Sequence, residues 1–281
     1  ADSERIPYVR TQIHKAEKLQ RYLRRVEKVN IIDSVETTVD SILAYCPLSA
    51  EVGSMTYTPD SNIIYTNQRA DRRLWATIHD SLSVIVSSHS LMGQWSHPDT
   101  LPQEVNIADK QAYPYVLSDG VTIYFAACDS NGLGGYDIYV TRYNTYTDSY
   151  TTPENLGMPF NSTANDYMMA INEVANLGWF ATDRNQPEGK VCVYVFIPNV
   201  EKVRVDVASM GYEKALAIAN ISSIADTQND ETAVRKARQQ MAMLMYSRET
   251  NRKKVDFLFV IDDHNDYNSL DDFKSEAARN L

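Results

Sequence analysis

The segment from residue 129 to residue 137, Asp-Ser-Asn-Gly-Leu-Gly-Gly-Tyr-Asp, contains the best candidate metal ligands in this sequence. Asp129, Asn131 and Asp137 could supply three side-chain oxygens, the ligand type that calcium prefers. The spacing departs from the helix-loop-helix calcium motif, because Leu133 stands at the fifth position and no Glu stands at the twelfth. A turn between two strands is therefore favoured over a calcium site, and we expect no cofactor.

Catalysis by a serine or cysteine nucleophile requires a histidine base held close to it. None of the five histidines lies in a Gly-x-Ser-x-Gly setting. The Ser-x-Asp-x-Gly-x-x-Trp motif of sialidase propellers is not reproduced either, because Ser118, Asp119 and Gly120 are contiguous. We therefore expect a protein that is not an enzyme.

The sequence is rich in aromatic residues that could contact a partner. It holds 18 tyrosines, more than strands alone require, and rigid aromatic side chains are good interface anchors. The same rings could stack on sugars, which keeps a glycan ligand open as an alternative. The candidate contacts are Trp95, Tyr136, Tyr143, Tyr146 and Tyr150.

Four further side chains favour structural interpretations. Asp183 and Arg184 could form an ion pair in a cleft, but a role in holding a turn is favoured. Cys128 and Cys192 lie at the ends of predicted strands, and buried thiols are favoured over a disulfide.

Composition restricts the class of protein and of partner. The 281 residues are 43% hydrophobic, enough to bury a core. A formal net charge of −10 disfavours binding to nucleic acid, which requires a basic face. No run approaches the roughly 18 to 20 apolar residues of a membrane-spanning helix, so we expect no transmembrane segment.

An internal repeat with an offset of 55 residues organises the middle of the chain. Residues 95–101 match residues 150–156 through a shared aromatic-x-x-Pro-x-x-Leu pattern, and Asn106 matches Asn161. Residues 124–126 match 179–181, and residues 138–140 match 193–195, at the same offset. The repeats cover about 52–107, 108–162 and 163–207, the first with loops of different length.

Each repeat has the pattern of a small antiparallel sheet. Three or four short strands every 50 or so residues are typical of a β-propeller blade. We expect a mainly β protein with a propeller-like array of antiparallel blades over residues 29–207. Closed propellers use about four to eight blades, so strands near 29–43 and 255–262 are expected to join the array and cover its edges.

Several motifs in these repeats resemble a known family. They are Ser-Asp-Gly at 118–120 before Ile-Tyr-Phe, Gly-Gly-Tyr-Asp at 134–137, Pro-Glu-Asn-Leu-Gly at 153–157 and Trp-Phe-Ala-Thr-Asp-Arg at 179–184. Together they resemble the TolB-type, WD-like β-propeller repeats. The resemblance implies a non-catalytic scaffold in the periplasm or at the outer membrane of a bacterial envelope. The first repeat departs from the family at residues 68–71, where Gln-Arg-Ala-Asp replaces Gly-Gly-Tyr-Asp.

Helical segments flank the repeats at 1–28 and 208–281. Residues 3–29 form a basic amphipathic pattern with eight Lys or Arg, suited to an acidic partner or an anionic membrane. Packing of this helix on its own domain is favoured. Further helices are predicted over 212–224, over 231–252 with Asp230 as N-cap, and over 269–281.

These observations predict a non-catalytic scaffold or protein-interaction module of the cell envelope that binds a protein partner. The alternative is a propeller protein that binds or cleaves glycans. A third interpretation is a periplasmic sensor whose last helix leads into a coiled coil.

Overall fold

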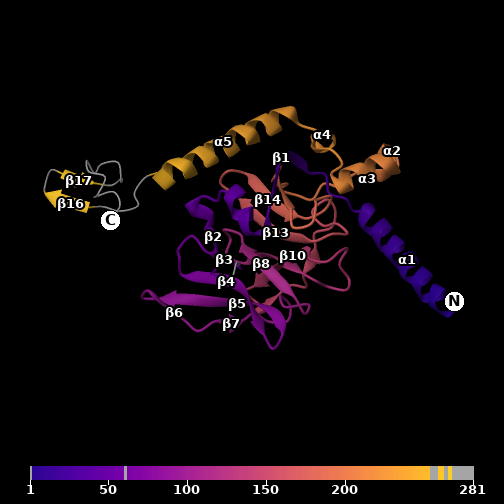
Figure 1. Cartoon of the computed structure of the whole chain (residues 1–281), viewed down its shortest axis with the longest axis horizontal. Coiled ribbons are helices and arrows are strands. Elements are labelled where there is room, and N and C mark those ends of the chain that lie inside the picture. The colour runs from indigo at the N-terminus through magenta and orange to yellow at the C-terminus, as the bar shows by residue number, and fades with distance from the viewer. Residues whose placement is uncertain (1, 60–61, 254–258, 263–264, 268–281) are drawn as a thin grey trace. The chain divides into compact units, whose positions relative to one another are not determined.

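The computed structural model describes residues 2–59, 62–253, 259–262 and 265–267. The chain divides into two compact units, Ala1–Arg238 and Gln239–Leu281. The first unit is mainly β and its named strands pair antiparallel, as predicted. Figure 1 shows these sheets in the centre of the unit.

Three sheets follow one another along the chain. Sheet 1 contains β2 (Ser54–Tyr57), β3 (Ile63–Thr66), β4 (Arg72–His79), β5 (Leu82–Leu91), β6 (Gln94–Trp95) and β7 (Asp99–Thr100). Sheet 2 contains β8 (Gln111–Val116), β9 (Thr122–Ala127), β10 (Asp137–Asn144), β11 (Ser149–Tyr150) and β12 (Glu154–Asn155). Sheet 3 contains β13 (Asp166–Asn172), β14 (Leu177–Thr182), β15 (Val191–Ile197) and β1 (Asn30–Thr37).

The sheets pack in series. Strand β8 lies against β3, β4 and β5 of sheet 1, and β13 lies against β8, β9 and β10 of sheet 2. The short helix η1 (Val39–Tyr45) contacts β1, β15 and β2, so it joins sheet 3 to sheet 1; η2 (Ala50–Val52) follows it. Among the residues that the structure describes, the strands form no closed barrel or propeller ring.

Two strands of sheet 3, β14 and β15, are buried along almost their whole length. All six residues of β14 are buried, and six of the seven residues of β15, mostly β-branched or aromatic, are buried as well. Such residues favour strands that are covered on both faces. The rings of Phe160, Phe180 and Phe196 meet there with centroids 5.1 to 5.9 Å apart, which gives this end of the unit a rigid core.

The outer edges of sheets 1 and 2 share one arrangement. Trp95 of β6 pairs with Ser90 of β5, and Tyr150 of β11 pairs with Tyr143 of β10. Thr100 of β7 and Asn155 of β12 likewise pair with β5 and β10. Trp95 and Tyr150 differ by 55 positions, and so do Thr100 and Asn155, so these short edge strands keep the offset seen in the sequence.

The alignment of the first repeat with the second, made from the sequence, was wrong by one strand. The sequence placed residues 68–71 opposite the Gly-Gly-Tyr-Asp loop, which would make β4 the counterpart of β10. The structure makes β5 that counterpart, because β5 carries the two short edge strands and touches β8. The counterpart of the Gly-Gly-Tyr-Asp loop is therefore the tight turn before β5, at Asp80 and Ser81, whose φ angles are 49° and 71°. Strand β2 is then an additional strand that the second repeat lacks.

Only one of the two expected edge strands joins the array. Strand β1 pairs antiparallel with β15, from Asn30 opposite Ile197 to Thr37 opposite Val191. The C-terminal strand β16 (Phe259–Asp262) instead pairs with β17 (Asn265–Tyr267) in a separate hairpin. That part of the prediction was wrong, since a strand with a partner close by in sequence needs no distant sheet edge.

The flanking helices are α1 (Asp2–Leu23), α2 (Val207–Met210), α3 (Tyr212–Asn220), α4 (Ile224–Thr227) and α5 (Glu231–Lys253). The helix predicted over 212–224 ends at Asn220, because Ile221 adopts a left-handed conformation with φ 53°. Asp230 caps α5 as predicted, with its Oδ1 accepting from the backbone N–H of Ala233 at 2.9 Å. The predicted helix over 269–281 lies outside the described residues.

Helix α1 packs on its own unit only near its C-terminal end. Leu23 and the following Val26 are buried against Ala215 and Ile218 of α3. Farther toward the N-terminus, the apolar side chains of Ile6, Val9 and Ile13 are 51% to 56% exposed. None of the helices in the described residues is long and apolar enough to cross a membrane.

Candidate functional site

The structure distributes the five predicted contact residues over three places. Tyr143 and Tyr150 form a cross-strand pair in the β10–β11 hairpin, and Tyr146 stands at its tip with 98% of its side chain exposed. Trp95 lies on β6 beneath the guanidinium of Arg73, which is 3.4 Å from the ring centroid. Tyr136 precedes β10 and joins two tyrosines that the sequence analysis did not select.

Tyr136, Tyr113 and Tyr167 form a cluster that we call the tyrosine cluster. The ring centroids of Tyr113 and Tyr167 are 5.8 Å apart, and each lies 6.3 Å from the centroid of Tyr136. Tyr113 meets both neighbours edge to face, at interplanar angles near 80°. All three side chains are half-buried.

Polar contacts from neighbouring segments fix the cluster. The Tyr167 hydroxyl donates to Asp183 Oδ2 at 2.8 Å, and Asp183 also accepts from the backbone N–H and the side-chain amide of Asn165. Asn165 Oδ1 in turn accepts from the backbone N–H of Tyr136 at 3.1 Å. Asp183 therefore has the structural role expected of it, because it positions two members of the cluster.

Tyr113 occupies an unusual backbone conformation. Its φ is 55°, in the left-handed region that bulky residues rarely adopt, and the register of β8 against β9 shifts between Ala112 and Tyr115. Such strained residues are concentrated at functional sites. The bulge turns Tyr113 out of the regular alternation and toward Tyr136.

A cavity of about 320 Å³ adjoins the cluster between sheets 1 and 2. Its walls include Tyr113 and Tyr136, the apolar side chains of Ile63 and Ile78, and the polar side chains of Ser81 and Lys110. Burial raises the pKa of Tyr113, of Tyr136 and of Tyr167, so all three phenols are protonated at neutral pH. The site thus offers uncharged aromatic surface with hydroxyl groups at its rim.

Hydrogen bonds of its own side chains hold the loop at 129–137 as a structural turn. Asp137 is fully buried and accepts from the backbone N–H groups of Leu133 and Gly134 and from Asn155 Nδ2. Asp129 Oδ2 accepts from the Tyr139 hydroxyl at 3.2 Å, and Asn131 is exposed. Within the described part of the chain, no group of three His, Cys, Asp or Glu residues could hold a metal ion.

Close packing explains the glycine at position 134. A Cβ atom at Gly134 would lie 2.0 Å from the carbonyl oxygen of Ala164, so only glycine allows the loop to approach sheet 3.

The carboxyl group of Asp137 has a shifted pKa. Burial raises this pKa to about 6, although the three N–H groups that donate to the carboxylate lower it.

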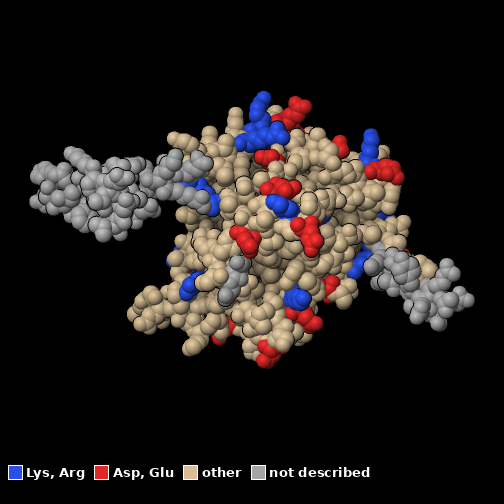
Figure 2. Space-filling model, in the orientation of Figure 1, with Lys and Arg blue, Asp and Glu red and all other residues tan. Residues whose placement is uncertain are grey.

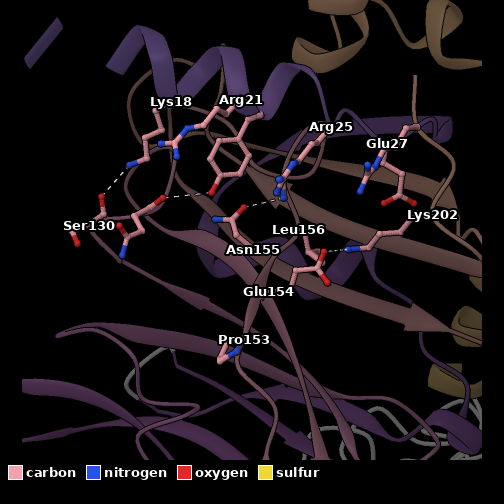
Figure 3. Close-up of a pocket in the computed structure, with 14 residues that line it drawn as sticks. Lys18, Arg21, Arg25, Glu27, Ser130, Pro153, Glu154, Asn155, Leu156 and Lys202 are labelled. Carbon is pink, nitrogen blue, oxygen red and sulfur yellow. Dashed lines mark hydrogen bonds and ion pairs between the residues drawn. The ribbon is translucent and has the colours of Figure 1, made fainter. Parts of the chain in front are cut away.

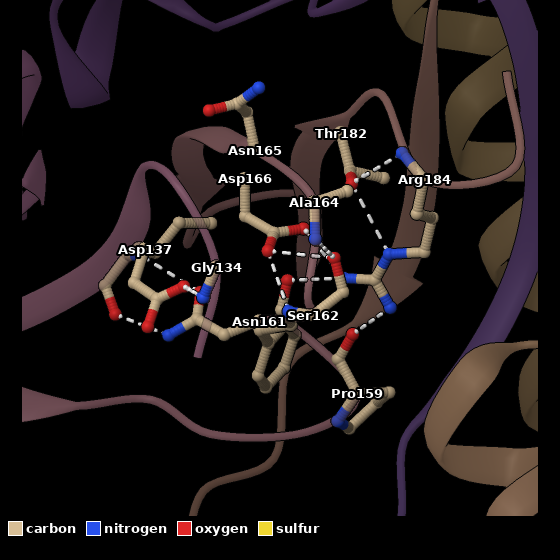
Figure 4. Close-up of polar contacts among 12 residues, drawn as sticks. Gly134, Asp137, Pro159, Asn161, Ser162, Ala164, Asn165, Asp166, Thr182 and Arg184 are labelled. Carbon is tan, nitrogen blue, oxygen red and sulfur yellow. Dashed lines mark hydrogen bonds and ion pairs between the residues drawn. The ribbon is translucent and has the colours of Figure 1, made fainter. Parts of the chain in front are cut away.

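Arg184 has a buried structural role, as the sequence favoured. Its Nη2 lies 2.7 Å from Asp166 Oδ1, and both side chains are almost fully buried. The guanidinium also donates to the carbonyl oxygens of Pro159 and Phe160 at 2.6 Å. Figure 4 shows Arg184 directed into this network, where Asp166 also accepts from the backbone of Ser162. The network holds residues 159–166, which lead into β13 beside the tyrosine cluster.

The cysteines form no disulfide. Cys46 and Cys192 are buried, and Cys128 is half-buried. Burial raises the pKa of Cys128 and of Cys192, which disfavours the reactive thiolate form.

A cleft beside α1 is a second cavity, which the sequence analysis missed. It has a volume of about 650 Å³ and lies between α1, the 129–137 loop and β12. Five cationic side chains line it: Lys18, Arg21, Arg25, Lys202 and Arg204. Lys18, Arg21 and Arg25 are spaced by three and four residues, which places them on one face of the helix, so this part of the cleft had a signal in the sequence.

Elsewhere the charged residues are dispersed. On the face drawn in Figure 2, basic and acidic side chains stand interspersed among a larger uncharged surface. In the cleft, by contrast, side chains of one charge gather beside a cavity.

Comparison of the sequence with protein-family models finds no match, and a search of curated proteins finds no similar chain.

Proposed function

We propose that this protein is a non-catalytic interaction module that binds a protein partner through the tyrosine cluster. The observation that carries the proposal is the convergence of Tyr113, Tyr136 and Tyr167 beside a cavity. Aromatic side chains that are already fixed lose little conformational entropy on binding, and tyrosine is enriched among residues that dominate interface energies. The strained backbone of Tyr113 supports the same assignment.

We further propose that the three sheets are blades of an open, propeller-like array of the TolB type. Two features support this: the sheets pack in series, and their outer edges repeat the same pairing at an offset of 55 residues. Strand β1 takes the corresponding outer place in sheet 3, as a strand from another part of the chain often does in propellers. The segment that contains η1 would then stand where further blades would close a ring.

The proposed location is the periplasm or the outer membrane of a bacterial cell. It rests on the resemblance of residues 118–184 to repeats common in envelope proteins. Fractionation of cells that produce the protein tests it, and recovery of the protein only with the cytosol would refute it.

The binding proposal is tested with immobilised protein, envelope extract and quantitative mass spectrometry. Proteins held by the wild type are compared with those held by Tyr136→Ala and by Tyr146→Ala, a control that removes a fully exposed tyrosine outside the cluster. A partner that binds the cluster is expected to weaken at least about tenfold with Tyr136→Ala, since loss of an aromatic anchor costs about 2 kcal/mol or more. Unchanged recovery of every bound protein by Tyr136→Ala would contradict the proposal.

A glycan ligand is the second candidate function. The supporting observation is that Tyr113 and Tyr136 share a cavity of about 320 Å³ with Asn62, Ser81 and Ser83, which could bond to sugar hydroxyls while a ring stacks on tyrosine. A glycan array with wild type and Tyr136→Ala separates the two candidates. If the wild type binds a sugar and Tyr136→Ala does not, the ligand of the tyrosine cluster is a glycan and not a protein.

A further inference from the structure

The cleft beside α1 has a charge opposite to that of the whole chain. The protein carries a formal net charge of −10, whereas the cleft has five cationic side chains and only two carboxylates, Glu27 and Glu154. Such a reversal of sign in a concave place attracts anionic ligands and concentrates them there.

The internal partners of the cleft leave three guanidinium groups without a carboxylate. Lys202 Nζ pairs with Glu154 Oε1 at 2.6 Å, and Lys18 Nζ donates to the carbonyl oxygen of Ser130 at 3.0 Å. Glu27 Oε1 accepts from the side-chain amide of Asn199 at 2.9 Å, and burial raises the pKa of Glu27. In the described residues, Arg21, Arg25 and Arg204 therefore have no carboxylate partner.

Helix α1, which carries Arg21, and the turn after it, which carries Arg25, are fixed in place. The Tyr22 hydroxyl donates to the carbonyl oxygen of Asn131 at 3.4 Å, and Leu23 is buried against α3. Figure 3 shows Lys18 directed toward Ser130 and Arg25 directed toward Asn155. Arg24 lies next to Arg25 in the turn after α1 and is exposed, but it does not line the cleft.

We propose that this cleft binds a carboxylate-rich peptide segment of a partner protein. Planar guanidinium groups match carboxylates with two parallel hydrogen bonds, and three of them can hold successive acidic side chains. The apolar side chains of Pro153 and Leu156 also line the cleft, and they can pack against aliphatic parts of a peptide. Glu154 remains in the cleft and disfavours ligands with very dense negative charge, such as polyphosphate.

The site is separate from the tyrosine cluster, because the two cavities share no lining residue. The proposal therefore does not depend on the proposed function. Substitution of Tyr136 is expected to leave binding in the cleft unchanged.

Fluorescence anisotropy tests the proposal with the full chain and a labelled peptide built from Glu-Glu-Leu triplets. Arg21→Gln, Arg25→Gln and Arg204→Gln are each expected to weaken binding about tenfold, since a hydrogen bond to a charged group contributes roughly 1.5 kcal/mol. Arg24→Gln is the matched control, because it removes the same charge from the residue next to Arg25 and outside the cleft. A peptide of Gln-Gln-Leu triplets is expected not to bind.

The outcomes distinguish the proposal from general attraction. Equal losses with Arg24→Gln and Arg25→Gln, or no binding of the Glu-Glu-Leu peptide by the wild type, would overturn it. Binding of inorganic pyrophosphate in place of the peptide would overturn it as well and would assign the cleft to phosphate ligands. The exposed arginines are not part of the core, so equal Tm values for all variants are expected to show that the fold is intact.

Discussion

At the scale of single residues, several candidates for chemistry have structural roles. Asp137, Asp183 and Arg184 are acidic and basic groups in loops, where a sequence suggests ligands or catalysts. The structure gives each of them several hydrogen-bond partners from neighbouring segments. Sequence patterns locate such polar positions, but they do not distinguish a side chain that holds a turn from one that faces solvent, because the partners come from distant residues.

Arg184 is expected to be essential for stability. Arg184→Ala leaves the buried Asp166 carboxylate without its charged partner and is predicted to lower the free energy of unfolding by about 3 to 5 kcal/mol. Urea denaturation measures this change. Lys190→Ala, which breaks a solvent-exposed pair with Glu36, is the control and is expected to cost no more than about 1 kcal/mol. Equal effects of the two substitutions would contradict the structural role of Arg184.

Asp137 is expected to titrate near neutral pH. Its pKa rises on folding from 3.8 to about 6, so the folded protein binds the proton more tightly than the unfolded chain does. This group therefore favours the folded state fully below about pH 4, and that contribution is lost as the pH rises to about 6, by about 3 kcal/mol at most. Carboxyl carbon NMR measures the midpoint, with Asp137→Asn for assignment. A midpoint at or below about 4 would show that the three N–H donors outweigh burial.

At the scale of elements, the repeat offset was the most informative feature of the sequence. Positions 95 and 150, and positions 100 and 155, lie on matching short edge strands in sheets 1 and 2. The offset failed where loop lengths differ, because a strand can be added or a loop shortened without changing the apolar pattern. That is why β2 and the two-residue turn before β5 were misassigned.

The matching asparagines are expected to have matching effects. Asn106 Oδ1 accepts from the backbone N–H of Ile85, and Asn161 Oδ1 accepts from that of Ile138, both at 2.7 Å. Each Asn also returns a hydrogen bond to the carbonyl of the same Ile. Asn106→Ala and Asn161→Ala are each predicted to lower the free energy of unfolding by about 1 to 3 kcal/mol, with the larger loss at the fully buried Asn161. Chemical denaturation of both variants measures this loss. If either substitution leaves the free energy of unfolding unchanged, the two repeats do not share these stabilising hydrogen bonds.

At the scale of the whole molecule, residues 1–238 should form the independent folding unit. The beginning of α5 belongs to this unit, since Val234 and Ala237 are buried and Arg238 Nε donates to the carbonyl oxygen of Ile32. A chain ending after Arg238 is predicted to keep its Tm within a few degrees. A chain ending at Asn229 loses those contacts and is predicted to unfold at a lower temperature. Differential scanning calorimetry measures both, and equal Tm values would contradict the assignment of α5.

The two binding sites also belong to this scale, and the sequence showed them only in part. Tyr136 and the basic face of residues 18–25 could be selected from the sequence. Their partners could not, because Tyr113 reaches the cluster through a bulge and Arg204 reaches the cleft from a segment about 180 residues farther along the chain. Both sites depend on how the sheets and α1 pack, which no local pattern specifies.

Photo-cross-linking in living cells tests the central claim most directly, namely that a protein partner binds at the tyrosine cluster. Benzoylphenylalanine is placed at position 136, at position 146 on the hairpin tip and at position 188 in an exposed turn as control. The account predicts a discrete cross-linked partner at position 136 and none at position 188. Cross-linking at position 146 alone, or at all three positions equally, would contradict it.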